Sequence, residues 1–336
     1  MAQRRLLWFA ALLAVALGVP ANASAEDKVL KAGIIGLDTS HVVAFTKGLN
    51  DPKATGYMAK VKVVAAYPGG SPDIPASADR VEGFTKTLAG MGVEIVDSID
   101  ELLKRVDVVL LESVDGRPHL EQVKPVIAAG KPVFIDKPVA ASLVDAIAIY
   151  RLAEKHKVPV FSSSSLRFSP GIIGLRNSDE VGEVRGALAY SPCSLEPHHP
   201  DLFWYGIHGV ETLFTVMGPG CETVTCVKTP GTHVVTGVWK DGRIGTFRGI
   251  RDGKAGYGGV VFGSKAIVPI GSYAGYTPLL EKIAEFFHTG VAPVSAEETI
   301  NLVAFMEAAD ESLRQGGKPV AIADVMKKAE AQLKDQ

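Results

Sequence analysis

The stretch "KAGIIGLDTSHVVAF" (residues 31–45) decides the fold of the N-terminal half of this 336-residue chain. An apolar run ends at Gly36, and a helix-like segment begins at Ser40. A buried strand that passes through a glycine turn into a helix opens a βαβ unit, and in dinucleotide-binding folds that turn reads Gly-x-Gly-x-x-Gly. Here Asp38 and His41 stand where the second and third glycines belong. The sequence therefore predicts a Rossmann-like fold with an altered phosphate-binding turn.

Strand-like and helix-like segments alternate throughout this half. Apolar, β-rich runs predict strands at Val29–Leu37, Val61–Tyr67, residues 93–97, Val106–Ser113, Pro132–Pro138 and Val158–Ser165. Amphipathic segments predict helices at Ser40–Leu49, residues 98–105, His119–Gly130 and Leu143–Lys157. Repeated βαβ units form a doubly wound parallel sheet with right-handed crossovers. We expect a Rossmann-like domain over residues 26–165.

The second half has a different pattern, which predicts an α+β domain over residues 166–336 with a mainly antiparallel sheet. Strand-like runs cover residues 183–191, 224–229, 233–250 and 257–270, and helices are expected at Phe203–Met217, Pro278–Phe287, Glu297–Arg314 and Ile322–Leu333. Asp241-Gly242 between two β-rich runs is a hairpin signal. The C-terminal helices can pack back on the first domain.

The first 25 residues have the composition of a secretory signal peptide. Arg4 and Arg5 precede an apolar run from Leu6 to Val19, and Ala23-Ser24-Ala25 is a small-residue cleavage site. We therefore expect an exported, periplasmic or extracellular protein without a membrane span. The formal net charge of −2 indicates neither a nucleic-acid partner nor an anionic membrane surface.

Three cysteines are too few for a disulfide framework. Cys221 and Cys226 can pair in an oxidising compartment or remain buried thiols, and the spacing alone does not choose between these states.

Several landmarks together resemble the glucose–fructose oxidoreductase/inositol dehydrogenase (Gfo/Idh/MocA) family. "AAGKPVFIDKPVA" resembles its Glu-Lys-Pro motif, "WYGIHGVETLFTVMG" its histidine helix, and "VVFGSKAIV" with residues 279–320 its closing strand and C-terminal helices. The resemblance covers nearly the whole chain after residue 25. It implies an oxidoreductase that acts on a sugar, polyol or sugar derivative with NAD(P). It also implies a homo-oligomer formed through the C-terminal sheet.

The resemblance places the cofactor site at the first βα turn, with the candidate residues Gly33, Gly36, Asp38, Thr39, Ser40 and His41. A carboxylate at Asp38 would face the two cofactor phosphates, and such a contact costs about 4 kcal/mol at an effective dielectric constant near 20. The alternative is that Asp38 caps the following helix. The second strand also ends at Tyr67 and Pro68, without the acid that binds the ribose hydroxyls in such folds.

Lys137, Asp136 and His208 are the candidate catalytic residues. In the family that the chain resembles, the lysine at the position of Lys137 lies between cofactor and sugar and hydrogen-bonds the hydroxyl that is oxidised. The alternative for Lys137 is a surface pair with Asp136. His208 and Glu211 lie three residues apart, which suits an oriented base or two metal ligands. The alternative for His208 is a core histidine bonded to its neighbour.

The carboxyl ends of parallel strands line one crevice, so polar residues after the strands are candidates for ligand binding. The candidate substrate-binding residues are Glu112, Arg117, His119, Arg167, Trp204, Tyr205 and Glu211. The candidate ligands of a divalent metal are Asp38, His41, Glu112 and His208.

Three functions remain open from the sequence. The first is a sugar or polyol oxidoreductase that uses NAD(P). The second is a cofactor-free or metal-assisted lyase or hydrolase that acts on a carbohydrate or oligosaccharide in the same crevice. The third is a non-enzymatic periplasmic binding or assembly protein.

Overall fold

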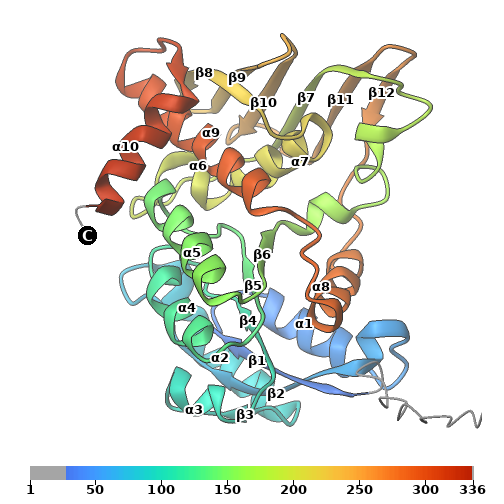
Figure 1. Cartoon of the computed structure of the whole chain (residues 1–336), viewed down its shortest axis with the longest axis vertical. Helices are drawn as coiled ribbons and strands as arrows, with labels where there is room; N and C mark the ends of the chain where they lie inside the picture. Colours follow the sequence, from blue (N-terminus) through green and yellow to red (C-terminus); the bar gives the residue numbers. More distant parts are fainter. Residues whose placement is uncertain (1–27, 335–336) are drawn as a thin grey trace, which may run out of the picture.

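The computed structural model describes residues 28–334, so the predicted signal peptide lies outside the described residues. Two sheets form the framework (Figure 1). The first has six parallel strands: β1 (Leu30–Ile35), β2 (Val61–Tyr67), β3 (Glu94–Ile95), β4 (Val108–Leu111), β5 (Val133–Asp136) and β6 (Val160–Ser163). Their order is β3-β2-β1-β4-β5-β6. This is the Rossmann order, and the chain reverses direction across the sheet between β1 and β4.

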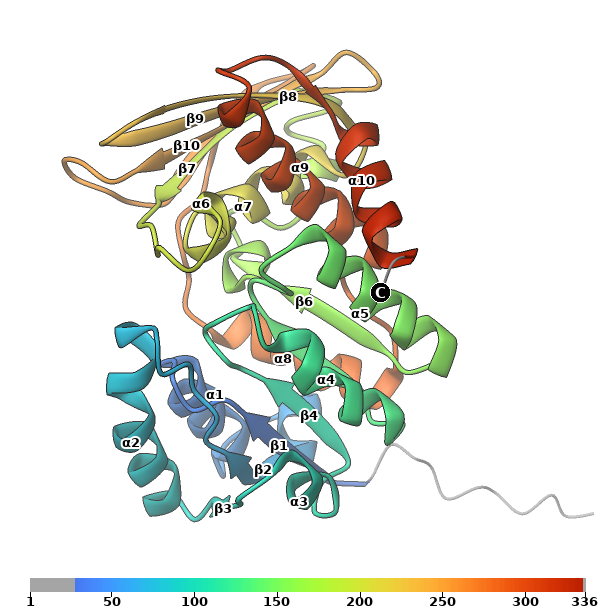
Figure 2. The same ribbon diagram turned by 90° about the vertical axis from the view of Figure 1, so that its left-hand side faces the viewer.

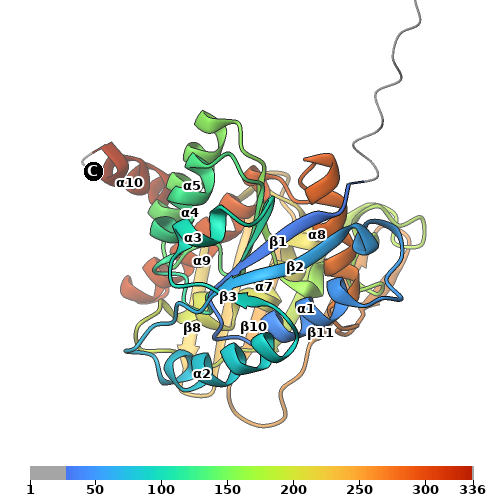
Figure 3. The same cartoon turned by 90° about the horizontal axis from the view of Figure 1, so that it is seen from below.

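Helices cover both faces of this sheet (Figure 3). One face packs against α1 (His41–Asn50), α2 (Pro75–Gly90) and the distant α8 (Thr277–Thr289). The other packs against α3 (Ile99–Leu103), α4 (His119–Ala128) and α5 (Leu143–His156). Strands buried on both faces need apolar side chains at nearly every position, which explains the continuous apolar runs of β4 and β5.

The second sheet is mixed, in the order β12-β11-β7-β10-β9-β8-β13. Its strands are β7 (Val184–Pro192), β8 (Cys221–Thr229), β9 (Thr232–Trp239), β10 (Ile244–Ile250), β11 (Gly258–Gly263), β12 (Ile267–Ile270) and β13 (Val320–Ala321). β9 and β10 form the hairpin predicted at Asp241-Gly242. All neighbouring pairs are antiparallel except β7 and β10, which run parallel.

The helices of the second half lie between this sheet and the Rossmann sheet (Figure 2). They are α6 (Asp201–Trp204), α7 (Ile207–Met217), α9 (Ala296–Arg314) and α10 (Ile322–Lys334), preceded by the short 3₁₀ turns η3 (Ser165–Phe168) and η4 (Leu175–Asn177). The other 3₁₀ turn, η2 (Gly56–Lys60), precedes β2. Because α9 and α10 pack against α5, one apolar core runs from the first sheet to the second.

Two details differ from the expected elements. The helix predicted at Phe203–Met217 is broken at Tyr205-Gly206, which places His208 in the first turn of α7. Helix α2 was not expected, because "PASADRVEGFTKTLAG" is polar and buries only Ser77 and Leu88 completely. None of the described helices is long and apolar enough to cross a membrane. All three cysteines are free and buried, so Cys221 and Cys226 are not paired.

Candidate active site

A pocket of about 460 Å³ lies where the carboxyl ends of the Rossmann strands face the second domain. Its lining residues come from both halves of the chain and are Thr39, Ser40, His41, Ala76, Arg80, Val114, Lys137, Ser165, Leu166, Ser194, Trp204, Tyr205, His208, Tyr257, Tyr273 and Tyr276. This is the crevice in which open α/β sheets bind ligands. Lys137, His208, Trp204 and Tyr205 are therefore brought together as candidate site residues.

Lys137 follows directly after β5 and lies in the wall of the pocket with 7% of its surface exposed. No hydrogen bond or ion pair of its Nζ is found among residues 28–334. Asp136 is fully buried beneath it, so the alternative of a surface pair between the two residues is wrong. A buried amine without a protein partner, at the edge of a pocket, is available to a ligand.

His208 lies in the first turn of α7, where its Nδ1 is 2.8 Å from Ser164 Oγ. The rings of Tyr205 and Tyr257 pack edge-on against the imidazole. Burial, followed by the positive charge of Lys137, lowers the pKa of His208 well below its usual value. His208 is therefore a neutral imidazole near pH 7, able to accept or donate one hydrogen bond towards the pocket.

Glu211 does not orient His208, although the two residues lie one turn apart on α7. Its carboxylate accepts a hydrogen bond from Ser163 Oγ at 3.0 Å and pairs with Arg167. Arg167 also pairs with Glu298 of α9, so this buried cluster joins η3 to two helices behind the pocket. Arg167 and Glu211 thus stabilise the pocket wall and do not face the cavity.

His41, Glu112 and Asp136 form a buried cluster beside Lys137. One potential ligand atom from each lies within 4.8 Å of the other two. His41 Nδ1 is 2.8 Å from Asp136 Oδ2 but lacks hydrogen-bond geometry, and neither carboxylate has a hydrogen-bond partner. Buried polar groups without partners are rare in proteins, because each one carries a desolvation cost. This cluster is thus the least satisfied part of the described molecule.

The charges in this cluster perturb one another. Burial, and then repulsion from Asp136, raises the pKa of Glu112 well above its usual value. Burial also opposes ionisation of Asp136, but the proximity of His41 and Lys137 outweighs it and lowers the pKa of Asp136. Two carboxyl groups whose pKa values shift in opposite directions, at the carboxyl edge of one parallel sheet, are typical of a ligand site.

The turn after β1 is filled by protein groups. The Asp38 carboxylate is fully buried, accepting hydrogen bonds from Ser77 Oγ at 2.6 Å and from the Val114 amide at 3.0 Å. It makes no side-chain cap on α1, so the capping alternative is wrong. Burial raises the pKa of Asp38, and the hydrogen bonds from Ser77 and Val114 partly offset that effect.

The backbone around this turn leaves little space for phosphates. The amides of Gly36 and Leu37 donate to the carbonyls of Tyr67 and Pro68 at 3.0 and 2.6 Å. Gly36 has φ +89°, and a Cβ there would lie only 2.4 to 2.6 Å from Ser113 atoms. The residues present therefore do not fit the pyrophosphate of a dinucleotide, because Asp38 occupies the groove and the nearby amides have protein partners.

A second polar network surrounds the carboxylate of Asp115. Asp115 accepts from Ser71 Oγ at 2.6 Å and lies 2.8 Å from His199 Nε2. It also pairs with Arg117, which continues to Asp73. Burial opposes ionisation of Asp115, but its bonds to His199, Arg117 and Ser71 lower its pKa far below the usual value. Arg117 therefore ties loops together and does not line the pocket.

The structure places the other predicted residues as follows. Thr39, Ser40 and His41 line the pocket, whereas Gly33 packs inside β1 against Leu102 and Val106. His119 is fully buried, with its ring nitrogens 3.2 Å from the Val139 carbonyl and 2.8 Å from that of Ser113. Of the four predicted metal ligands, only His41 and Glu112 come together.

Three tyrosines that line the pocket were not expected from the sequence. Tyr257, Tyr273 and Tyr276 come from glycine-rich loops of the second half, and the hydroxyl of Tyr257 donates to that of Tyr205 at 3.2 Å. Burial, and then interaction with Tyr205, raises the pKa of Tyr257. Tyr273 and Tyr276, in "GSYAGYTP", lie outside the expected strands, and that position was the available signal, whereas Tyr257 begins the expected run 257–270.

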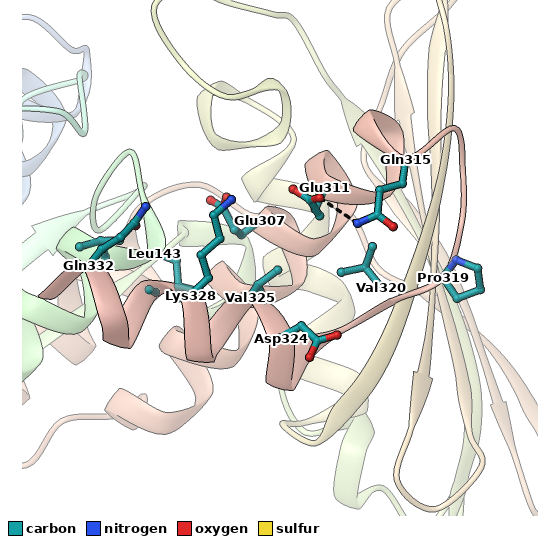
Figure 4. A pocket seen from close by; sticks show the side chains of 12 residues that line it. Leu143, Glu307, Glu311, Gln315, Pro319, Val320, Asp324, Val325, Lys328 and Gln332 are labelled. Carbon is teal, nitrogen blue, oxygen red and sulfur yellow. Dashed lines mark hydrogen bonds between the residues drawn. The ribbon is translucent and has the colours of Figure 1, made fainter. Parts of the chain in front are cut away.

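Another hollow, of about 270 Å³, lies between α9, α10 and the start of α5 (Figure 4). Glu311, bonded to Gln315, projects into it together with Glu307, Asp324 and Lys328. It contains none of the predicted site residues. The pocket around Lys137 is therefore the candidate active site.

Comparison with known proteins agrees with the Rossmann fold of the first domain. Residues 31–164 match the Gfo/Idh/MocA model of an oxidoreductase family with an NAD-binding Rossmann fold. This part of the chain, residues 31–164, belongs to the Gfo/Idh/MocA family. Its sequence is 28% identical over 129 residues to the rhizopine catabolism protein MocA of Rhizobium meliloti, covering 38% of this chain and 40% of that protein. It is 29% identical over 110 residues to the myo-inositol dehydrogenase Hyg17 of Streptomyces leeuwenhoekii, covering 33% and 32%. The matches thus span less than half the length of these curated relatives.

Solved structures match over a larger part of this chain. The scyllo-inositol dehydrogenase of Lactobacillus casei with bound NAD(H) and scyllo-inositol has a TM-score of 0.72 at 16% identity, covering 88% of this chain and 100% of that one. An Agrobacterium radiobacter oxidoreductase in complex with NAD⁺, L-tartaric acid and magnesium has a TM-score of 0.70 at 16% identity, covering 88% and 99%. Likeness at this identity shows the shared fold.

Proposed function

We propose that this protein is an enzyme of the Gfo/Idh/MocA type that acts on a sugar, polyol or sugar derivative. The observation that carries the proposal is the pocket in which Lys137 and His208 lie with hydroxyl-bearing aromatic rings. Trp204 offers a flat apolar surface to a sugar ring, and Tyr205 offers a hydroxyl to its oxygens. The family membership and the named inositol dehydrogenase relative support this substrate class.

Lys137 is the proposed proton-transfer group. Its amine has no protein partner and lies at the end of β5, where the backbone holds it towards the cavity. His208 is neutral and held by Ser164, which suits a group that accepts one substrate hydroxyl and fixes its direction. Proton transfer by a positioned side chain contributes about 10²- to 10⁴-fold to rate. Asp136 directly precedes Lys137 in the chain, and the positive charge of Lys137 helps to lower the pKa of Asp136.

The family and its NAD-bound neighbours favour oxidation with NAD(P) as the reaction class. A bound nicotinamide supplies hydride transfer. The filled turn at Asp38 opposes that class, so we assign no step to the dinucleotide here.

The second candidate is a cofactor-free or metal-assisted lyase or hydrolase on the same fold, and two observations favour it. The groove for the pyrophosphate is occupied by Asp38, and His41 of the pocket lining belongs to a buried cluster with the unsatisfied carboxyl groups of Glu112 and Asp136. A base such as Lys137 can remove a proton next to a carbonyl or carboxylate of a sugar derivative without any redox partner. The geometry supports this proton-transfer class better than hydride transfer.

Product analysis distinguishes the two classes. The protein is incubated with sugars, polyols, keto sugars and uronates, with and without NAD(P), and the products are identified by mass spectrometry. We expect elimination or hydrolysis products that form without nicotinamide and are absent with Lys137→Ala. Products two hydrogens lighter than the substrate, formed only with NAD(P), would assign the oxidoreductase class instead.

We also propose export to the periplasm or the medium, on the composition of residues 1–25. Cell fractionation followed by N-terminal sequencing should find a mature protein that begins at Glu26. A protein retained in the cytoplasm with residues 1–25 intact would contradict export.

A homo-oligomer through the second sheet is the proposed assembly. Exposed apolar residues lie on the sheet face opposite to the helices: Val227, Val238, Ile244, Phe262 and Ile267. Light scattering after gel filtration should give a multiple of the chain mass. Ile244→Asp combined with Phe262→Asp should reduce it towards the monomer, and a monomeric wild type would contradict the proposal.

A further inference from the structure

We infer that His41, Glu112 and Asp136 form the binding site for one divalent transition-metal ion, of the Mn²⁺ or Zn²⁺ class. The three residues come from the start of α1 and the ends of β4 and β5, which meet at the carboxyl edge of the Rossmann sheet. The inference deepens the second candidate of the proposed function, although metal binding itself is measurable without a substrate.

Unpartnered atoms carry the inference. Both oxygens of Glu112, both of Asp136 and Nδ1 of His41 are buried without a hydrogen bond. Glu112 and Asp136 each have no exposed surface. Leaving buried polar groups unpaired costs about 1–3 kcal/mol each, and more when they are charged. These atoms belong to three residues whose ligand atoms converge, which indicates a group that supplies the missing bonds.

The spacing fits a single cation. One ligand atom from each residue lies within 4.8 Å of the others, and His41 Nδ1 is 2.8 Å from Asp136 Oδ2 and 3.9 Å from Glu112 Oε2. Neighbouring ligands of a tetrahedral ion at 2.0–2.2 Å are about 3.4 Å apart. Small side-chain rotations would therefore bring the three ligand atoms around one ion. Two carboxylates carry the charge that a divalent ion neutralises, and Lys137 hydrogen-bonds neither of them.

The donor set selects the class of metal. One imidazole nitrogen and two carboxylate oxygens suit Mn²⁺, Zn²⁺ and related first-row ions, whereas Ca²⁺ and Mg²⁺ prefer oxygen alone and Cu⁺ prefers sulfur. Three protein ligands leave a position for water or substrate, as in catalytic zinc sites. His41 and Lys137 both line the pocket, so that open position would lie at the pocket floor, where a cation can polarise a substrate oxygen.

Calorimetric titration of chelator-treated protein with MnCl₂ and with ZnCl₂ tests the inference. We expect one ion per chain for wild type, with at least about tenfold weaker binding for both Glu112→Gln and Asp136→Asn. The matched control is Asp38→Asn, which removes a buried carboxylate from the same edge of the sheet and should keep wild-type affinity. Circular dichroism and thermal melts of the metal-free variants check that each variant is folded.

Visible absorption of the Co²⁺-loaded protein provides a second readout, because a bound Co²⁺ ion absorbs according to its ligands. The spectrum should appear in wild type and Asp38→Asn and be lost in Glu112→Gln. Absence of stoichiometric binding by wild type, or equal affinity in folded Glu112→Gln, would overturn the inference. Failure to find a substrate would affect the proposed function and leave the metal result unchanged.

Discussion

Asp38 and Glu112 are two fully buried carboxylates at the same edge of one sheet, and they differ in what surrounds them. Asp38 accepts two hydrogen bonds from protein donors, whereas Glu112 has none. The Asp38 carboxylate thus has its hydrogen-bond partners within the protein, whereas the carboxyl group of Glu112 would find partners only in a bound ligand. In this chain protein groups fill the groove that would hold the phosphates of a dinucleotide, and the unpartnered groups lie beside Lys137 at the same edge of the sheet.

The largest expected effect concerns the pocket wall around Lys137. Lys137→Ala should lower kcat/KM about 10³-fold, because it removes the only unpartnered amine in the pocket lining. Steady-state kinetics on the substrate found by product analysis provides the measurement. Lys86→Ala on the exposed face of α2 is the matched control and should be within twofold of wild type. Retention of full activity by folded Lys137→Ala would remove the lysine from the mechanism.

The next largest effect tests the polar network around Asp115, whose members all have protein partners. Asp115→Ala should lower the free energy of unfolding by about 3 kcal/mol, because it leaves His199 and Arg117 without their partner. Since the folded-state pKa of Asp115 is lowered, its contribution is present above about pH 4 and is lost as the pH falls further. Urea unfolding at pH 7 and at pH 3 measures both effects. An unchanged free energy of unfolding at pH 7 would mean that the network around Asp115 does not stabilise the fold.

A third buried carboxylate shows that an unpartnered acid alone does not make a site. Asp310 in α9 has no side-chain hydrogen bond or ion pair among residues 28–334, but no metal-ligating residues converge on it. Burial raises its pKa to about 7, so the unfolded chain ionises first as the pH rises. Below about pH 4, Asp310 is neutral in the folded and the unfolded chain and costs no stability. Between about pH 4 and pH 7 the free energy of unfolding falls, because only the unfolded chain releases this proton.

Asp310→Asn should therefore stabilise the protein at pH 8 by about 2 kcal/mol, below the limit of about 4 kcal/mol set by the pKa shift. At pH 4 the variant should match wild type or be slightly weaker. Thermal melts across this pH range provide the measurement. A stabilisation that does not depend on pH would exclude the titration of Asp310 as its cause.

The smallest expected effect is a gain of function at the filled turn. Asp38→Gly removes the carboxylate and frees the Val114 amide and the Ser77 hydroxyl, so NADH affinity should rise about tenfold if the variant folds. Asp38→Asn keeps the side-chain volume and should gain less. Equal binding by wild type and both variants would show that Asp38 does not limit dinucleotide access.

Local pattern was sufficient to predict most of the fold. The apolar runs of β1, β2 and β5 and the hairpin at Asp241-Gly242 each depend on neighbouring residues, and all are confirmed. Helix α2 was missed because it packs at the sheet edge with a polar sequence. The break before α7 was missed because it accompanies contacts that are distant in the chain, which no local pattern reports: Gly206 lies close to Cys193, and Tyr205 accepts a hydrogen bond from Tyr257.

The site was only partly predictable. Strand ends pointed to Lys137, which lines the pocket, and to Glu112, which lies in the buried cluster beside it, because parallel strands share one edge. The sequence could not show that Asp115 would bind Arg117 and His199, or that His119 would use both ring nitrogens on backbone carbonyls. Such partners are distant in the chain. Without them, satisfied and unsatisfied polar residues look the same in a sequence.

Titration of the purified wild-type protein with NADH and NADPH, followed by nicotinamide fluorescence, tests most directly whether the groove at Asp38 is closed. We predict no saturable binding up to about 1 mM of either dinucleotide. Saturation with a dissociation constant of about 10 μM or below would contradict the closed groove and restore hydride transfer as the reaction class.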